Sequence, residues 1–169
     1  MNSYPKVILT TGNNKGRKCA AEVLNRVIPY DENARVEEEV RNVISVYSKL
    51  DPLTLYGLLR SAPPSSAFKI FPLMTTTGAD AKEAIKEGII TLENKKIQKF
   101  YVECYKRGGE INCRELEIGI GMGMRGKGTV NYTDPDSVLF INVMRNFIGL
   151  SVLKKGQEKL SASTLKLNI

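Results

Sequence analysis

Through the first 74 residues, the spacing of apolar and polar positions is typical of short strands and amphipathic helices. Runs of β-branched or alternating apolar residues predict strands, and apolar residues spaced three or four apart predict helices. The predicted strands cover 6–11, 34–40, 43–48 and 67–74, and the predicted helices cover 17–28 and 52–62. Asp51 followed by Pro52 is typical of a helix N-cap with proline at the first helical position. The order strand, helix, strand, strand, helix, strand predicts a ferredoxin-like domain.

The second part of the chain also mixes helices and strands, in a different order. Asn112, followed by Glu115 at the third helical position, predicts the start of a short helix. The predicted helices cover 81–92 and 114–120, and the predicted strands cover 96–106, 129–133, 137–145 and 147–155. We therefore expect an α+β fold with mixed sheets. Its ferredoxin-like domain should cover 1–75, a second domain 76–156, and a loose C-terminal tail 157–169.

A glycine-rich stretch, GIGMGMRGKG at 119–128, interrupts the pattern of the second domain. It contains one G-x-G-x-x-G, but a dinucleotide site needs a strand before this motif and a helix after it, and here the predicted order is reversed. Two interpretations remain. The glycines form a flexible connection at positive φ while Met122 and Met124 fill the core, or the same connection presents Arg125 and Lys127 to phosphate groups.

The charge of the chain favours an anionic partner. The net charge is +7 and the pI is near 9.3, and a basic surface attracts polyanions and releases their counterions on binding. Residues 1–68 hold nine Lys and Arg against seven Asp and Glu, whereas residues 69–169 hold sixteen against eleven. We therefore expect a polyanion site in the second half.

Several absences narrow the class of function. The chain has no histidine, which removes the commonest general base and the commonest metal ligand, so any catalysis would need Asp, Glu, Lys, Tyr or Cys alone. We predict no catalytic residue, no metal and no cofactor. Cys19, Cys104 and Cys113 are odd in number and widely spaced, and we expect three buried apolar side chains rather than a disulfide framework or a zinc site. No apolar run reaches the roughly 18 residues that span a bilayer. With no signal-like N-terminus, we expect a cytoplasmic protein without a membrane partner.

Two longer segments carry a resemblance to a known family. The THUMP domain is the family that they resemble, and the segments are KFYVECYKRGGEINCRELEIGIG and VNYTDPDSVLFINVMRNFIGLSVLKKG. The shared features are a strand ending in a basic pair, a helix ending in glycine, a turn with Pro135 and Asp136, and a final strand close to GLSV-x-K. FKIFPLMTTTGAD resembles the connection between a ferredoxin-like domain and a THUMP domain. The resemblance covers residues 6–155 and implies that the second domain, 76–156, is a THUMP domain.

The resemblance also implies a function. THUMP domains are known as tRNA-binding modules of tRNA-modifying enzymes that recognise the acceptor stem and its 3′ end. The opening VILTTGNNKGRKCAAEVL is similar to the stand-alone accessory proteins that present tRNA to an RNA acetyltransferase making N4-acetylcytidine. We therefore expect a tRNA-binding adaptor that is not an enzyme and whose protein partner is an RNA cytidine acetyltransferase.

Eight basic residues are candidates for contact with RNA, because proteins grip A-form RNA through its shape, phosphates and 2′-hydroxyls. They stand at strand ends, at the start of a helix, in the glycine-rich stretch and in the linking strand: Lys69, Lys106, Arg107, Arg114, Arg125, Lys127, Lys154 and Lys155. We expect those of the second domain to share one cationic groove. A second cluster, Lys15, Arg17 and Lys18, is typical of the exposed surface at a helix start.

Two other classes of function stay open from the sequence. Asp134 and Asp136 flank Pro135, an arrangement typical of a turn, but paired carboxylates also suit a metal-dependent enzyme acting on RNA. Alternatively, a basic surface suits a protein-interaction module with an acidic partner.

Overall fold

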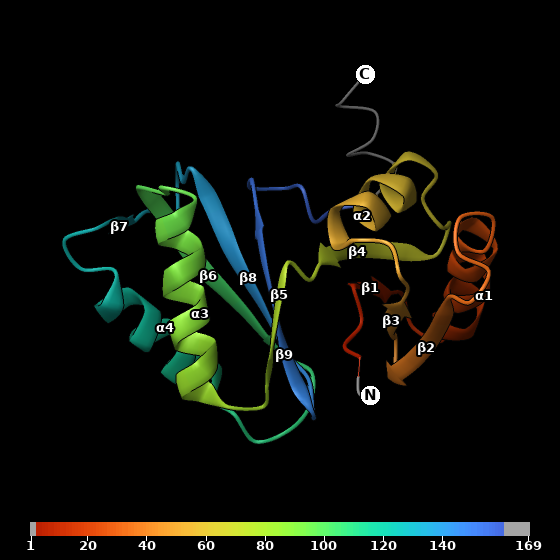
Figure 1. Cartoon of the computed structure of the whole chain (residues 1–169), viewed down its shortest axis with the longest axis horizontal. Coiled ribbons are helices and arrows are strands. Elements are labelled where there is room, and N and C mark those ends of the chain that lie inside the picture. The colour runs from red at the N-terminus through yellow and green to blue at the C-terminus, as the bar shows by residue number, and fades with distance from the viewer. Residues whose placement is uncertain (1–2, 161–169) are drawn as a thin grey trace. The chain divides into compact units, whose positions relative to one another are not determined.

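The structure is a computed structural model that describes residues 3–160. The chain forms two compact units (Figure 1). The first runs to Leu73 and resumes at Glu158, and the second covers Met74–Gln157. The predicted boundary after residue 75 therefore lies two residues beyond the observed one.

The first unit has the predicted order of elements: β1 (Val7–Thr11), α1 (Gly16–Val27), β2 (Arg35–Val40), β3 (Val43–Tyr47), α2 (Pro52–Ser61) and β4 (Ala67–Pro72). Its sheet has the order β2-β3-β1-β4, and every neighbouring pair is antiparallel. This is the ferredoxin-like arrangement that the sequence predicts. The N-cap of α2 is also confirmed, because the Asp51 carboxylate accepts hydrogen bonds from the backbone N–H groups of Leu53 and Thr54, both at 3.2 Å.

The chain returns to the first unit after Gln157. Ile70 N–H donates to the Glu158 carbonyl and Leu160 N–H donates to the Phe68 carbonyl, each at 2.8 Å, so this segment pairs with β4. Leu160 is 4% exposed and joins the core of the first unit. The expected loose tail is wrong for 158–160, because one apolar side chain and two backbone hydrogen bonds fix it. The rest of that predicted tail, 161–169, lies outside the described residues.

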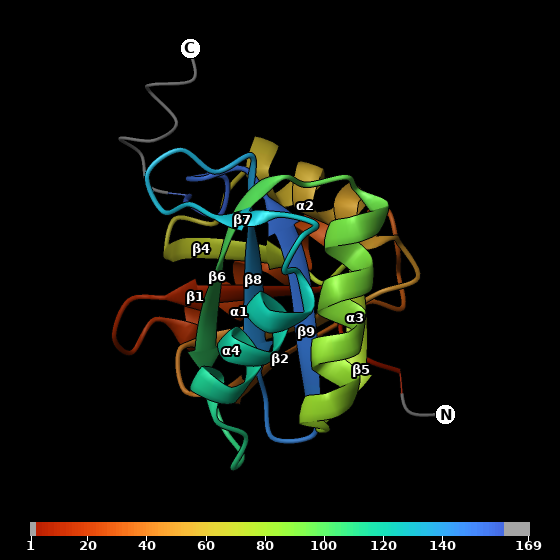
Figure 2. The same cartoon turned by 90° about the vertical axis from the view of Figure 1, so that its left-hand side faces the viewer.

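The second unit contains β5 (Thr75–Gly78), α3 (Ala81–Asn94), β6 (Lys99–Lys106), α4 (Cys113–Gly123), β7 (Thr129–Val130), β8 (Ser137–Val143) and β9 (Phe147–Leu153). Its sheet order is β5-β9-β8-β6-β7, with β6 parallel to β7 and β8 and the remaining pairs antiparallel. Helices α3 and α4 lie side by side over the sheet (Figures 1 and 2). Side chains from both helices and from β6, β8 and β9 form one core. The fold class is therefore α+β with a mixed sheet, as predicted.

The glycine-rich stretch differs from the prediction. Helix α4 does not end at residue 120, as predicted, but continues to Gly123. A Cβ built on Gly119 would lie 2.5 Å from Ile85 Cδ1, and one on Gly123 would lie 2.1 Å from Ile89 Cδ1, so these glycines allow α4 to lie directly against α3. Met124 is 1% exposed and fills the core as expected, but Met122 is 57% exposed.

The cysteine prediction is correct at one position and wrong at two. Cys19 is a free, buried side chain in α1, and burial raises the pKa of its thiol to about 11. Cys104 in β6 and Cys113 at the start of α4 form a disulfide with a Cα–Cα distance of 5.6 Å. The reason is the turn between them, which folds back and brings two cysteines nine residues apart to one place.

Candidate nucleic-acid interface

Helix α3 and strand β9 end, and strand β6 begins, at one end of the second unit (upper end in Figures 1 and 2). Basic residues of these elements and of the connection after α4 lie there. We call this region the basic end. It comprises Lys95, Lys96, Lys99, Arg125, Lys127, Lys154 and Lys155. All are exposed except Lys99, which is half-buried. The nearby acidic groups are Glu93, Asp134 and Asp136, so cations outnumber carboxylates here and the surface attracts polyanions.

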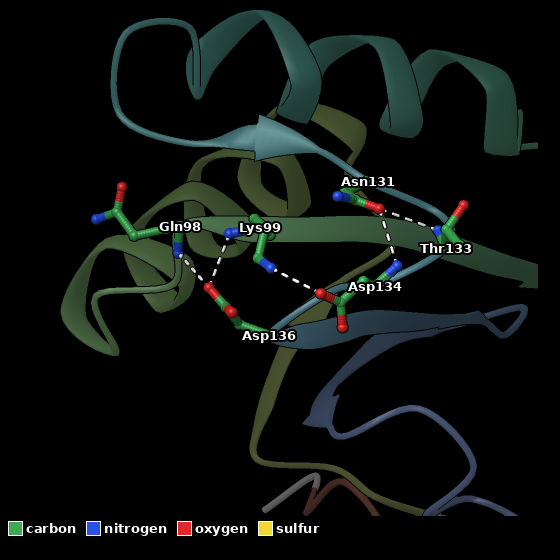
Figure 3. A network of polar contacts seen from close by, with 6 residues as sticks. All are labelled: Gln98, Lys99, Asn131, Thr133, Asp134 and Asp136. Atoms are coloured by element: carbon green, nitrogen blue, oxygen red, sulfur yellow. Dashed lines mark hydrogen bonds and ion pairs between the residues drawn. The ribbon is translucent and has the colours of Figure 1, made fainter.

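The loop between β7 and β8 is fixed by its own polar side chains (Figure 3). Asp136 accepts hydrogen bonds from the backbone N–H groups of Gln98 at 3.2 Å and Lys99 at 2.9 Å. The hydrogen bond from Lys99 N–H is the main cause that lowers the pKa of Asp136. Asn131 Oδ1 accepts from Thr133 N–H at 3.0 Å, which closes an Asx turn and ends the predicted strand after Val130.

The side chain of Lys99, the first residue of β6, contacts the same loop. Its Nζ lies 3.0 Å from Asp134 Oδ2, and this hydrogen bond raises the pKa of Lys99. The carboxylates of Asp134 and Asp136 therefore hold the turn against the start of β6. Among residues 3–160, no group of three or more His, Cys, Asp or Glu side chains is placed to hold a metal ion.

The glycine-rich connection presents two of the predicted cations at the basic end. Gly126 adopts φ +77° directly after α4, a conformation that favours glycine, and Arg125 and Lys127 flank it. Lys127 Nζ forms an ion pair with Glu93. In residues 3–160, Arg125 has no ion-pair partner. A shallow pocket of about 310 Å³, lined in part by Lys96 and Lys127, opens beside them.

The last predicted pair, Lys154 and Lys155, follows β9 at the same end. Lys155 Nζ donates to the Tyr132 carbonyl at 3.0 Å, which ties this segment to the loop after β7. The Tyr132 side chain is 67% exposed, and its ring lies 5.2 Å from that of Tyr101 between centroids. The basic end therefore combines cations with an exposed aromatic ring.

Three other predicted contacts lie at the opposite end of the sheet. Lys106 is the last residue of β6, Arg107 follows it, and Arg114 lies in the first turn of α4. Because β6 has eight residues and a strand rises about 3.3 Å per residue, the two ends are about 25 Å apart. Arg145, in the turn between β8 and β9, lies close to Gly108 at this same opposite end.

The Arg107 side chain is held by contacts with other side chains of the second unit. Its Nε donates to Asn142 Oδ1 at 3.1 Å, and its guanidinium lies 4.5 Å from the ring centroid of Tyr105. Burial lowers the pKa of Arg107, which still leaves it protonated at neutral pH.

The expected single groove is therefore wrong. Four of the eight predicted residues share the basic end, three lie at the opposite end, and Lys69 lies in β4 of the first unit. Sequence reasoning missed Lys95, Lys96 and Lys99. Their signal was available, because helix 81–92 and strand 96–106 were predicted with three lysines at the junction between them.

No protein-family model matches the chain, and no curated protein sequence matches it either. Among solved structures, PH1313 from Pyrococcus horikoshii Ot3 is similar, with TM-score 0.64 and 16% identity over 88% of this chain and 54% of that one. TrmN from Thermus thermophilus gives TM-score 0.63 and 16% identity over 92% of this chain and 46% of that one. A 4-thiouridine synthetase in an RNA complex with bound ATP gives TM-score 0.58 and 17% identity over 92% of this chain and 44% of that one.

At these identities the likeness establishes the fold. Both units are included in it, because 88–92% of this chain is covered in each case. The shared fold is the ferredoxin-like unit followed by the α+β unit with a mixed sheet. The chain spans about half the length of the solved proteins that it resembles.

Proposed function

We propose that the chain is a THUMP-type RNA-binding module that binds the acceptor stem and 3′ end of a tRNA. It presents this end to a tRNA-modifying enzyme, an RNA cytidine acetyltransferase, and catalyses no reaction itself. The observation that carries the proposal is the fold shared over 92% of the chain with a 4-thiouridine synthetase solved with RNA. The sequence resemblance to THUMP domains and the net charge of +7 support the same class of partner.

The basic end is the part of the second unit that we assign to RNA. Its exposed lysines and Arg125 can contact phosphates, and such contacts release counterions, so affinity should fall steeply with salt. Arg114 is not part of the basic end, because it lies in the first turn of α4 at the opposite end of the sheet. Arg107 is committed to Asn142 and Tyr105.

The test is a binding assay with the full chain and three RNAs: a tRNA, the same tRNA without its 3′ end, and an unrelated hairpin. We expect the intact tRNA to bind most tightly. Arg125→Glu with Lys127→Glu should weaken its binding by roughly 10-fold or more and reduce the slope of log affinity against log salt by about 2, because each phosphate contact contributes about 0.9.

The matched control reverses two exposed lysines on α3, Lys82→Glu with Lys86→Glu, which makes the same change in net charge away from the basic end. If this control weakens binding as much as the Arg125 and Lys127 pair, the effect is net charge and not a site. Equal affinity for all three RNAs would contradict recognition of the acceptor end.

The adaptor role needs a separate measurement. Added to an RNA cytidine acetyltransferase with acetyl-CoA, ATP and tRNA, the wild-type chain should raise the yield of N4-acetylcytidine, and the Arg125 and Lys127 double variant should not. The chain incubated alone with the same reagents should leave the tRNA mass unchanged. A mass change without the acetyltransferase would show that the chain is an enzyme.

A further inference from the structure

The first unit contains a concave pocket that the RNA site described above does not use. The pocket has a volume of about 380 Å³, which lies within the range of small-molecule sites. It opens between the start of α1 and the loop before β4. Its walls include Lys15, Lys18, Ser65, Ser66 and Phe68.

Phe68 supplies an exposed aromatic ring. It is 57% exposed, whereas its neighbours Ala67 and Ile70 on β4 are buried in the core. The ring lies against the backbone of Gly12, where an added Cβ would be 3.2 Å from Phe68 Cζ. Phe68 therefore leaves much of its apolar ring in contact with water instead of burying it. A ring exposed in a pocket is suited to stacking against a flat partner.

Lys15 and Lys18 supply positive charge at the same pocket. They lie close together at the start of α1, whose first turn has no acidic residue. Cations at a helix N-terminus oppose the helix dipole, so folding alone does not favour them there. Two carboxylates lie near them: that of Glu22, which accepts hydrogen bonds from Ser65 N–H at 2.9 Å and Ser66 Oγ at 2.8 Å, and that of Glu38, which lies against Gly16.

The two serines complete the lining. Both hydroxyls donate to Glu22, Ser65 at 3.0 Å and Ser66 at 2.8 Å. A hydroxyl that donates one hydrogen bond still accepts through its lone pairs, so the exposed Ser65 oxygen can accept from a 2′-hydroxyl or an amino group, whereas Ser66 is buried. The pocket therefore offers an aromatic ring, two cations and an acceptor, which match the base, phosphate and sugar of a nucleotide.

We propose that this pocket binds one unpaired nucleotide of an RNA chain, with its base stacked on Phe68 and its phosphate held by Lys15 and Lys18. The nucleotide must be unpaired, because only a base outside a duplex exposes its face to a protein ring. The inference rests on the RNA binding proposed above and gives the first unit a contact of its own.

The test uses the full chain and three ligands: a duplex RNA with a single-stranded tail, the same duplex with blunt ends, and free AMP. A 2-aminopurine in the tail reports stacking by loss of its fluorescence. Phe68→Ala should weaken binding of the tailed RNA roughly 10-fold, within the range for one lost base stack, and should abolish the fluorescence change. Phe68→Tyr should keep both, and binding of the blunt duplex should not change.

Two further variants separate the proposed contacts from general effects. Lys15→Glu with Lys18→Glu should also weaken binding of the tailed RNA, and more than the Lys82 and Lys86 reversal on α3. Tyr30→Ala removes another exposed aromatic ring, 60% exposed, and should have no effect. Thermal unfolding of each variant checks that it is folded.

The outcomes distinguish this inference from the proposed function. If wild-type protein binds tRNA and Phe68→Ala leaves the tailed RNA and its fluorescence unchanged, the inference fails and the proposed function stands. An equal loss for the blunt duplex would also overturn it. AMP bound as tightly as the tailed RNA would assign the pocket to a free nucleotide instead. If the basic-end variant is without effect while the Phe68 effect persists, the assignment of the basic end fails and the pocket stands.

Discussion

The contact between α3 and α4 gives a prediction that can be worked out residue by residue. Alanine stabilises a helix interior by about 1 kcal/mol relative to glycine, so a Gly→Ala change in α4 should be favourable wherever space exists. Gly121 has space, since an added Cβ meets no atom within 4 Å. We expect Gly121→Ala to raise the free energy of unfolding by about 0.5–1 kcal/mol.

Gly119→Ala, two residues earlier in the same helix, should have the opposite sign. Its Cβ would lie 2.5 Å from Ile85 Cδ1 and 3.2 Å from Ile85 Cγ2. The Cδ1 atom can move, but Cγ2 is fixed by the stiff χ1 angle of a β-branched residue in a helix. Overpacking of this kind costs about 1–3 kcal/mol, which exceeds the gain in helix propensity. We expect a net loss of about 1 kcal/mol.

The assay is urea unfolding followed by circular dichroism, with both variants compared with wild type. Adding Ile85→Val to Gly119→Ala deletes the nearest methyl group, and the double variant should lose less stability than the two single changes combined, by at least roughly 0.5 kcal/mol. The reasoning is refuted if Gly119→Ala is as stable as Gly121→Ala, because then α4 does not lie against α3 through this glycine.

Two further predictions concern stability. Replacing Cys104 and Cys113 by serine should lower the free energy of unfolding by about 2–3 kcal/mol, because the disulfide closes a short loop in the unfolded chain; thiol titration of unreduced, unfolded protein should find only Cys19, and three titrated thiols would show that the bond does not form. The lowered pKa of Asp136, caused mainly by the hydrogen bond from Lys99 N–H, contributes stability above the carboxyl group's ordinary pKa that is lost as pH falls below about 4. The melting temperature of wild type should therefore fall more steeply on acidification than that of Asp136→Asn, and parallel curves would contradict this.

Local signals in the sequence were sufficient for most elements. The first unit follows from the alternation of apolar residues and from the cap at Asp51, both of which depend on neighbouring residues only. β5 was missed because its sequence, Thr75–Gly78, is polar. It becomes a strand because it pairs with β9, from Thr75 opposite Leu150 to Gly78 opposite Phe147, and such long-range pairing is invisible to a local pattern.

The glycines and the cysteines show the same limit. Gly119 has low helix propensity, and only the presence of Ile85 on a neighbouring helix explains why a glycine is required there. Cys104 and Cys113 meet because of a turn whose geometry the sequence did not specify. At the candidate site, residue type was enough to name candidate cations, but the direction of β6 decided that Lys106 and Lys127 lie at opposite ends of the sheet.

The return of the chain at Glu158 makes the second unit an insertion within the first. Met74–Gln157 is joined to the ferredoxin-like unit by two covalent crossings rather than by a single linker. A fragment ending at Leu73 would lose the partner of Ile70 N–H and the buried side chain of Leu160. Cutting the chain once to isolate the ferredoxin-like unit should therefore lower the stability of that unit. Replacing 74–157 by a short bridge would instead keep the pairing of 158–160 with β4.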